Sequence, residues 1–257
     1  MTLKSEKTVS SYESWLQSPL GYYVDRRKKE FICNLLNPRE GERLLDLACG
    51  TGHNLLFFRR KGCDVTGIDT SADRIETARE RLGQRAELLS GDCEDLPFSD
   101  NEFDIVTMIC PNNLNDQRTA LTEAVRVCRE RIFLGSWNKY SPAALSGKIK
   151  DKHRLSFIKY SKLSTIIELK ELVKSVLPDV TPTWGSVVFF PLNWYTFAID
   201  IEEKIPVMKN PFGFFIGLMV PVFSSLQTIQ DPLTEKGELK VATNGYGAPG
   251  AAREIKK

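Results

Sequence analysis

The segment from Leu44 to Gly52, Leu-Leu-Asp-Leu-Ala-Cys-Gly-Thr-Gly, constrains the fold of this chain more than any other. Its leucines are typical of a buried parallel strand, which leads through the acid Asp46 into a turn of small residues. Gly50 and Gly52 permit a tight turn and a close approach of the backbone to a ligand, which a bulky side chain would block. With a helix expected to begin near His53, the segment predicts a pocket for a nucleotide cofactor without saying which one.

Two more acids follow predicted strands further along the chain. The run Asp64-Val65-Thr66-Gly67-Ile68-Asp69 is expected to form a second strand, whose final carboxylate stands where a doubly wound fold accepts hydrogen bonds from two ribose hydroxyls. Asp92 follows the short predicted strand Ala86–Leu89 and is suited to accept a hydrogen bond from an adenine amino group. Ligands bind at the carboxyl ends of the strands in such sheets, so three acids after three successive strands predict one site.

Helical and strand-like patterns alternate through this part of the chain. Helices are predicted at Leu55–Arg60, Asp73–Leu82 and Arg118–Cys128, and strands at Ala86–Leu89, Phe103–Met108 and Arg131–Gly135. Ser71 is a suitable N-cap for the second of these helices, and Gly83 is a suitable stop. The β-α-β-α order predicts a parallel sheet.

Four segments together resemble a known family. They are Asp46–Gly52, Gly67–Ser71, Gly91–Phe98 and Phe103–Val106, and the region they cover is roughly residues 40–137. In this order they look like the first three motifs and the fourth-strand motif of the class I S-adenosylmethionine-dependent methyltransferases. Within that group the chain is similar to the small-molecule branch that includes the ubiquinone- and menaquinone-biosynthesis methylases. The resemblance implies an α/β, Rossmann-like fold with a mostly parallel seven-stranded sheet, helices on both faces and a last antiparallel strand.

The resemblance also implies which residues bind the cofactor, S-adenosyl-L-methionine. Asp46 and the backbone of the glycine-rich turn would hold its methionine part. Asp69 would bind the ribose, and Asp92 with the amide of Cys93 would bind the adenine. The full set of implied cofactor-binding residues is Tyr12, Asp46, Ala48, Gly50, Gly52, Asp69, Thr70, Asp92 and Cys93.

Two of these assignments, Ala48 and Tyr12, and the nearby position Arg74 carry an alternative or a departure from the family. Ala48 stands where the family often has its first glycine, and a methyl group is the smallest possible intrusion. Arg74 stands where a Met or Leu often packs near the adenosine, which leaves that wall of the pocket undefined. Tyr12 lies in a segment that resembles the helix capping the cofactor in related methylases, although an aromatic stripe packed on the sheet would explain it equally well.

A nicotinamide dinucleotide is the main competing cofactor, because it too requires a glycine-rich turn and an acid after the second strand. Its fingerprint is Gly-x-Gly-x-x-Gly, whereas here Gly50 and Gly52 are followed by Leu55. Asp46 would repel a diphosphate but can pair with the ammonium of a methionine moiety. The spacing and the charge therefore favour the methyl donor.

The composition is typical of one ordinary soluble enzyme domain. The chain has 257 residues, of which 42% are hydrophobic and 26% charged, and its formal net charge is +2. Acids and bases are interspersed except in short runs such as Arg26-Arg27-Lys28-Lys29, which is predicted to be a solvated helix face. The stretch Cys110-Pro111-Asn112-Asn113 lacks the second proline and the aromatic residue of the DNA amino-group methylases. No nucleic-acid partner is therefore expected.

Cysteine usage and the chain ends bear on metal binding and location. Six cysteines are scattered without a Cys-x-x-Cys pair, and only two histidines occur, so no metal site is predicted. The first residues lack the apolar core of a signal peptide, which predicts a cytoplasmic protein with reduced thiols. The apolar segment Phe212–Phe223 holds about a dozen residues where a membrane span needs about 20, so a buried strand and no transmembrane segment are expected.

The second half of the chain is less regular. A helix capped by Ser164 is predicted at Thr165–Leu177, and the last two strands, an antiparallel pair, at Ser186–Phe190 and Phe214–Val220. The predicted division is N-terminal capping helices at 1–40, a cofactor-binding domain at 41–230 with substrate-side insertions at 138–163 and 191–212, and a loosely ordered tail at 231–257. Trp194 and Tyr195 are predicted either to cover an acceptor or to pack in the core.

The expected function is methyl transfer to a small, partly apolar molecule by in-line displacement, for which an enzyme mainly desolvates and aligns the nucleophile. His53, Asp116 and Tyr140 are candidate general bases, and no catalytic residue is assigned among them. The alternative is a non-catalytic S-adenosylmethionine-binding sensor or a partner subunit of another enzyme. The sequence leaves the acceptor and the oligomeric state open.

Overall fold

The computed structural model describes residues 12–110, 114, 116–145, 163–205 and 209–222. The elements below belong to the unit Met1–Ser224. The predicted tail at 231–257 lies outside the described residues, as does most of the predicted insertion at 138–163. The proposed boundaries of the capping helices and insertions remain predictions.

A seven-stranded sheet has the order β3-β2-β1-β4-β5-β7-β6. Its strands are β1 (Arg43–Leu47), β2 (Asp64–Asp69), β3 (Glu87–Ser90), β4 (Phe103–Ile109), β5 (Cys128–Trp137), β6 (Thr183–Val187) and β7 (Phe215–Pro221). Strand β7 lies between β5 and β6 and is antiparallel to both, while the pairs among β1 to β5 are parallel. The predicted fold class is confirmed, including the antiparallel strand.

Strand β6 is displaced from its predicted position. It spans Thr183–Val187 instead of Ser186–Phe190. The reason lies in Val188, whose left-handed backbone (φ 68°) turns the chain out of the sheet. A β-branched residue in this conformation is strained, and Val188 is held there by donating its N–H to a carboxylate oxygen of Glu202 at 2.9 Å.

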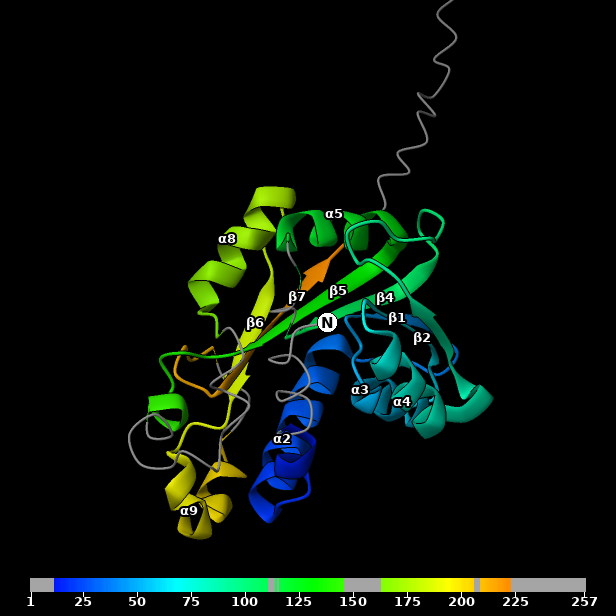
Figure 1. The fold of residues 1–257 in the computed structure, drawn as a ribbon. Helices are drawn as coiled ribbons and strands as arrows, with labels where there is room; N and C mark the ends of the chain where they lie inside the picture. The colour runs from blue at the N-terminus through cyan, green and yellow to red at the C-terminus, as the bar shows by residue number, and fades with distance from the viewer. Residues whose placement is uncertain (1–11, 111–113, 115, 146–162, 206–208, 223–257) are drawn as a thin grey trace, which may run out of the picture. The chain divides into compact units, whose positions relative to one another are not determined.

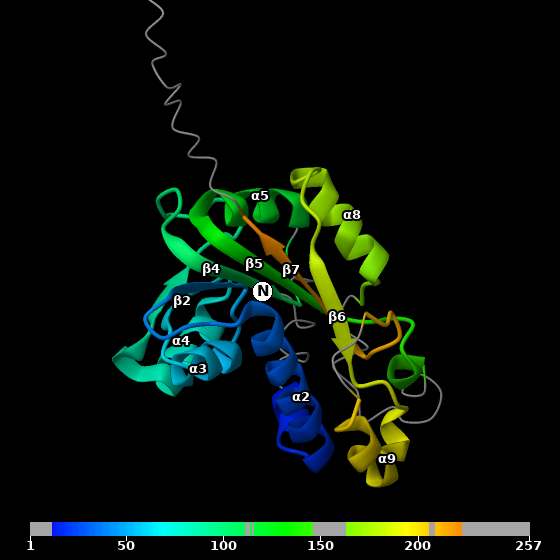
Figure 2. The ribbon, with the colours of Figure 1, turned by 180° about the vertical axis from the view of Figure 1, so that it is seen from behind.

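Helices cover both faces of the sheet. They are α2 (Pro19–Leu36), α3 (His53–Arg60), α4 (Ala72–Leu82), α5 (Gln117–Val127), α8 (Ile166–Val176) and α9 (Tyr195–Glu202). Helices α2, α3 and α4 lie on one face, and α5 and α8 lie on the other (Figures 1 and 2). Each layer buries its own apolar cluster against the sheet, so the sheet separates two cores.

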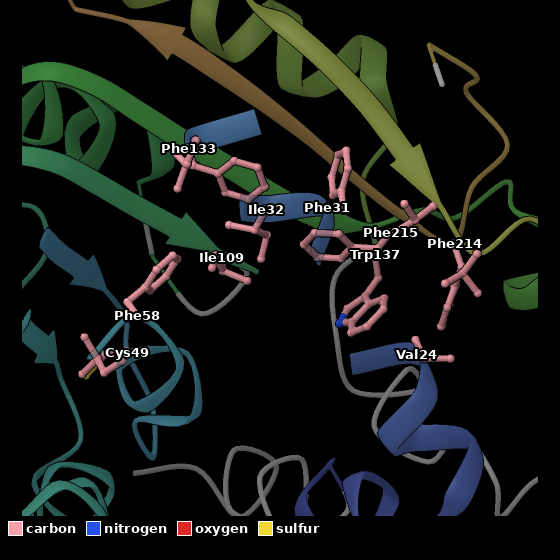
Figure 3. Close-up of a cluster of buried hydrophobic side chains, with 14 of the residues drawn as sticks. Val24, Phe31, Ile32, Cys49, Phe58, Ile109, Phe133, Trp137, Phe214 and Phe215 are labelled. Carbon is pink, nitrogen blue, oxygen red and sulfur yellow. The ribbon is translucent and has the colours of Figure 1, made fainter. Parts of the chain in front are cut away.

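The larger core forms where α2 crosses strands β5 and β7. Phe31 packs edge-on against Phe133 and Phe215, with ring centroids 6.2 and 6.1 Å apart, and Trp137 stacks at 4.7 Å on Phe214. Figure 3 shows these rings meeting between the helix and the sheet. Of the three aromatic residues predicted to be core residues, Phe214 and Phe215 are fully enclosed, whereas Phe189, just after the left-handed Val188, is only half-buried.

The helix termini follow local sequence signals. Ser71 caps α4 by accepting the N–H of Arg74, as predicted. Helix α8 is capped by Thr165, one residue later than predicted, because Thr165 and Glu168 form a reciprocal capping box.

The apolar segment near the end of the described chain forms strand β7, as predicted, rather than a helix. Throughout the described ranges, every helix is too short or too polar to cross a membrane.

Candidate cofactor and acceptor site

Asp46 lies in β1 directly opposite Thr107 of β4, near the carboxyl ends of both strands. The Thr107 hydroxyl donates a 2.6 Å hydrogen bond to Oδ1 of Asp46, whose exposed fraction is only 1%. Among the described residues, no donor reaches the other oxygen, Oδ2. Burial raises the pKa of Asp46 to about 7, against the lowering effects of Thr107 and of the positive charge of Lys28. A buried carboxylate with one oxygen unsatisfied is suited to receive a cationic group.

The glycine-rich turn after β1 has left-handed backbone at Ala48, Gly50 and Gly52, with φ values of 55°, 57° and 77°. A Cβ on Gly52 would lie 2.9 Å from the side chain of Leu82, so only glycine fits there without displacement. A Cβ on Gly50 would meet no described atom within 4 Å, which leaves this backbone open to a ligand. Helix α3 begins directly afterwards without a side-chain cap, and uncapped N–H groups attract anions.

Asp69 ends β2 beside the same turn and is almost fully buried. Its Oδ2 accepts the Gly50 N–H at 2.9 Å and an Arg74 guanidinium hydrogen at 3.2 Å. Its Oδ1 accepts the N–H of Ser71 at 2.9 Å. Asp69 therefore braces the glycine-rich turn, and its assignment to the ribose remains a prediction that the spare acceptor capacity of a carboxylate permits. No pattern in the sequence predicts the ion pair with Arg74.

The residues predicted beside the adenine lie at the next strand end. Asp92 follows β3, is exposed, and accepts the N–H of Glu94 at 2.9 Å. Cys93 is buried, and burial raises the pKa of its thiol to about 12, so it is an uncharged packing residue at neutral pH. Thr70, directly after β2, is exposed. The structure brings these three residues to the same sheet edge as Asp46 and Asp69, and their contacts with a cofactor remain predictions.

The prediction that Arg26-Arg27-Lys28-Lys29 forms a solvated helix face is wrong at Lys28. This lysine is only 2% exposed, and its ammonium pairs with Asp25 at 2.8 Å. It also donates to the Tyr12 hydroxyl at 3.1 Å and to Oδ1 of Asn54 at 3.4 Å. Burial alone would lower the pKa of Lys28, but Asp25 and Tyr12 raise it above its ordinary value. Lys28 is therefore a permanent buried cation.

Tyr12 and Trp137 enclose the Lys28 ammonium with their rings, whose centroids are 5.8 and 6.0 Å from Nζ. Burial raises the pKa of Tyr12 to about 12, although the charge of Lys28 opposes the shift. The sequence shows the i,i+3 and i,i+4 spacing of Asp25 with Lys28 and Lys29, which predicts ion pairs. It contains no signal that the pair would be buried at the ligand edge of the sheet.

Glu13 joins the helical turn at residues 12–16 to the glycine-rich turn. Its Oε1 accepts the Thr51 hydroxyl at 2.7 Å and an Arg81 guanidinium hydrogen at 3.1 Å, and Arg81 also donates to the Thr51 carbonyl. Oε1 lies 3.4 Å from Nε2 of His53. Burial and the charge of Arg81 lower the pKa of His53 to about 4, so its imidazole is neutral at physiological pH.

The other two candidate bases lie in ordinary structural settings. Asp116 is the exposed N-cap of α5, where its carboxylate accepts the N–H groups of Arg118 and Thr119. Tyr140 is exposed, with the Lys139 ammonium 5.5 Å from its ring centroid. Capping and surface exposure account for both residues, so their role as bases remains untested.

The predicted insertion at 191–212 has a buried side and an exposed side. Tyr195 is enclosed against Tyr23, with ring centroids 5.3 Å apart, and its hydroxyl lies 3.4 Å from Oε2 of Glu202. Glu202 is fully buried, which raises its pKa, and it accepts the N–H groups of Val188 and Phe189. Trp194, by contrast, is 56% exposed. Tyr195 is thus a packing residue, and Trp194 is the member of the pair available to meet an acceptor.

Comparison with known proteins gives a consistent result. The profile of a family described as "Methyltransferase domain" matches residues 44–131. The "Ubiquinone/menaquinone biosynthesis C-methyltransferase UbiE" of Ruegeria sp. (strain TM1040) is 35% identical over 214 residues, which are 80% of this chain and 77% of the relative. The "Demethylmenaquinone methyltransferase" of Thermotoga maritima is 33% identical over 115 residues, covering 44% of this chain and 50% of the relative. For that protein and three further relatives, the chain spans 39–57% of the relative's length.

Solved structures agree on the fold. A crystal structure from Thermotoga maritima, described as an S-adenosylmethionine-dependent methyltransferase and a possible histamine N-methyltransferase, has a TM-score of 0.64. Its sequence is 21% identical, and the alignment covers 83% of this chain and 95% of that chain. The sheet order, the motifs and the relative matched over most of its length lead to one assignment. This chain belongs to the class I S-adenosylmethionine-dependent methyltransferases, with S-adenosyl-L-methionine as its cofactor.

Proposed function

We propose that this chain transfers the methyl group of S-adenosylmethionine to a ring carbon of a small, partly apolar acceptor of the quinol type. The observation that carries the proposal is the unsatisfied buried oxygen of Asp46 beside the open backbone of Gly50. An acid and a glycine at this edge fit an α-ammonium and a close backbone contact. The names of the relatives support the acceptor class, because they are methyltransferases of menaquinone and ubiquinone biosynthesis.

The proposed roles on the donor side follow the order of the strands. Asp46 pairs with the ammonium of the methionine part, and the backbone at Ala48 and Gly50 lies against it. Asp69 accepts the ribose hydroxyls while it braces the turn, and Asp92 accepts the adenine amino group. The cofactor supplies the reactive methyl group, and the contribution of this chain is to bind, align and exclude water.

The acceptor side is proposed to be the aromatic carboxyl end of strand β5. Trp137 ends β5, and Trp15 packs edge-on against it at 6.1 Å between ring centroids. The Tyr12 hydroxyl completes this wall beside Lys28. Aromatic walls favour a flat apolar ring over a polar acceptor.

Apart from Asp46, whose carboxylate is proposed to pair with the donor's ammonium, the titratable groups with shifted pKa values at this edge are not strong bases at neutral pH. Lys28 stays protonated, burial raises the pKa of Tyr12 to about 12, and that of His53 falls to about 4 through burial and the charge of Arg81. The acceptor must therefore bring its own nucleophilic carbon, as an electron-rich quinol ring does. The chain then acts mainly by alignment and desolvation.

The test is methyl transfer from S-adenosylmethionine to short-chain demethylated quinols, with the methylated product and S-adenosylhomocysteine both measured by mass spectrometry. We expect turnover with a quinol, and a loss of roughly 10- to 100-fold in kcat/KM for Asp46→Asn, because a charge-assisted hydrogen bond is removed. Glu76→Gln, which changes an exposed acid of α4, is the matched control and should retain full activity. Donor binding without methylation of any quinol would refute the acceptor class, and absence of donor binding would refute the whole proposal.

A further inference from the structure

Lys28 is a buried cation that the donor roles above do not use. It projects from α2 to the carboxyl end of the sheet, where its ammonium contacts Asp25, Tyr12 and Asn54. Burying an ammonium costs several kcal/mol unless it is compensated, and here Asp25, Tyr12 and Asn54 supply that compensation. A buried charge at the carboxyl ends of the strands, where sheets of this kind bind ligands, calls for a functional explanation.

The local charges do not cancel among the described residues. Asp25 is shared, because its two oxygens pair with Lys28 at 2.8 Å and with Lys29 at 2.5 Å. Tyr12 and Asn54 are neutral, so this cluster carries one net positive charge. Asp46 is near enough for the charge of Lys28 to lower the pKa of its carboxyl group. Among the described residues, however, only one of its two oxygens accepts a hydrogen bond, which comes from Thr107.

Asn54 places the cation beside the glycine-rich turn. It belongs to the first turn of α3, the helix that begins without a side-chain cap. The Lys28 ammonium and the positive end of the α3 dipole therefore act on the same region, and both favour an anion. The unsatisfied oxygen of Asp46 is exposed to the same positive charge and favours a cation.

A site with these two halves is complementary to an α-amino acid zwitterion. We infer that Lys28, together with the first turn of α3, binds the carboxylate of the donor's methionine part while Asp46 binds its ammonium. Because three contacts occupy the three hydrogens of the Lys28 ammonium, the ligand's carboxylate replaces the longest of them, the 3.4 Å contact with Asn54. The inference rests on the proposed function, because it assumes that the donor binds at this edge. It assigns α2, outside all the matched sequence motifs, a direct part in donor recognition.

The experiment compares two ligands that differ only in the carboxylate. They are S-adenosylhomocysteine and its decarboxylated analogue, 5′-deoxy-5′-(3-aminopropylthio)adenosine, titrated calorimetrically into the full chain. Wild type should bind the first at least 10-fold more tightly, the range expected of a charge-assisted hydrogen bond. Lys28→Met should bind S-adenosylhomocysteine at least 10-fold more weakly and the analogue as wild type does.

Lys29→Met is the matched control, because it removes the neighbouring lysine that pairs with the same Asp25 carboxylate. It should retain the full preference for S-adenosylhomocysteine. Asn54→Asp tests the same subsite with Lys28 in place, so it keeps the proposal falsifiable if Lys28→Met does not fold. The new carboxylate beside the ammonium should compete with the ligand's carboxylate and remove most of the preference.

The outcomes separate this inference from the proposed function. If wild type binds neither ligand, the proposed function fails and the inference fails with it. If wild type binds both ligands equally, or if neither Lys28→Met nor Asn54→Asp reduces the preference, donor binding stands and the assignment of the carboxylate to Lys28 is overturned. An equal loss for both ligands in Lys28→Met would show that Lys28 only supports the fold.

Discussion

Replacing Asp46 by asparagine should make the stability of the ligand-free protein less dependent on pH. Asparagine has nearly the same shape as aspartate. It keeps an oxygen that can accept the hydrogen bond from Thr107, which is 2.6 Å long in the wild-type protein. What it removes is the ability to ionise. The variant therefore isolates the free energy of placing a negative charge at a site that is 1% exposed.

The magnitude follows from the two pKa values of the carboxyl group. An aspartate has an ordinary pKa of 3.8, and burial raises that of Asp46 to about 7 in the folded protein. The folded state thus binds more protons than the unfolded state between about pH 4 and pH 7, so the free energy of unfolding falls as the pH rises through this window. The complete loss is about 4 kcal/mol, and about 2.5 kcal/mol of it falls between pH 5 and pH 8.

The assay is urea unfolding, followed by tryptophan fluorescence, at several pH values between 5 and 8. Wild type should lose about 2.5 kcal/mol more than Asp46→Asn over this range. Asp92→Asn changes an exposed acid at the same sheet edge and should follow wild type. If the curves of wild type and Asp46→Asn run parallel, the carboxyl group is not held in its neutral form and the reasoning is refuted.

Two further predictions concern binding and the packing of α9. Donor affinity should rise between pH 6 and pH 8 in wild type, because only ionised Asp46 pairs with an ammonium. Calorimetry on Asp46→Asn should show that this rise is abolished. If the variant retains the rise, another group causes it. Glu202→Leu should lower stability by about 3 kcal/mol in thermal unfolding, because the buried N–H groups of Val188 and Phe189 lose their acceptor. Glu202→Gln keeps an acceptor oxygen and should lose less, and an equal loss in both variants would contradict this explanation.

The parts of the fold that were predictable from the sequence have a strong local signal. Strand β1, the glycine-rich turn and the N-cap Ser71 depend on residue types at fixed spacing, and the structure has them as predicted. The end of β6 was misplaced because Val188 would normally continue a strand. Its left-handed backbone depends on Glu202, a tertiary contact 14 residues away that no local pattern encodes.

The candidate site divides in the same way. The positions of Asp46 and Asp69 at the carboxyl ends of their strands are predictable, because an apolar strand with an acid and small residues at its end is a local sequence pattern. Lys28 was not, because a lysine in a run of four basic residues is normally solvated. Its burial results from the packing of α2 with Tyr12 and Trp137, which come from distant parts of the chain.

The link from Glu13 to Thr51 and Arg81 bears on kinetics. With the donor bound as proposed, beside the glycine-rich turn, these contacts act on the rate at which it leaves. We therefore expect Glu13 to set how long the donor remains bound and how quickly spent cofactor is exchanged. The N-terminal turn would then control the rate of cofactor dissociation in each catalytic cycle.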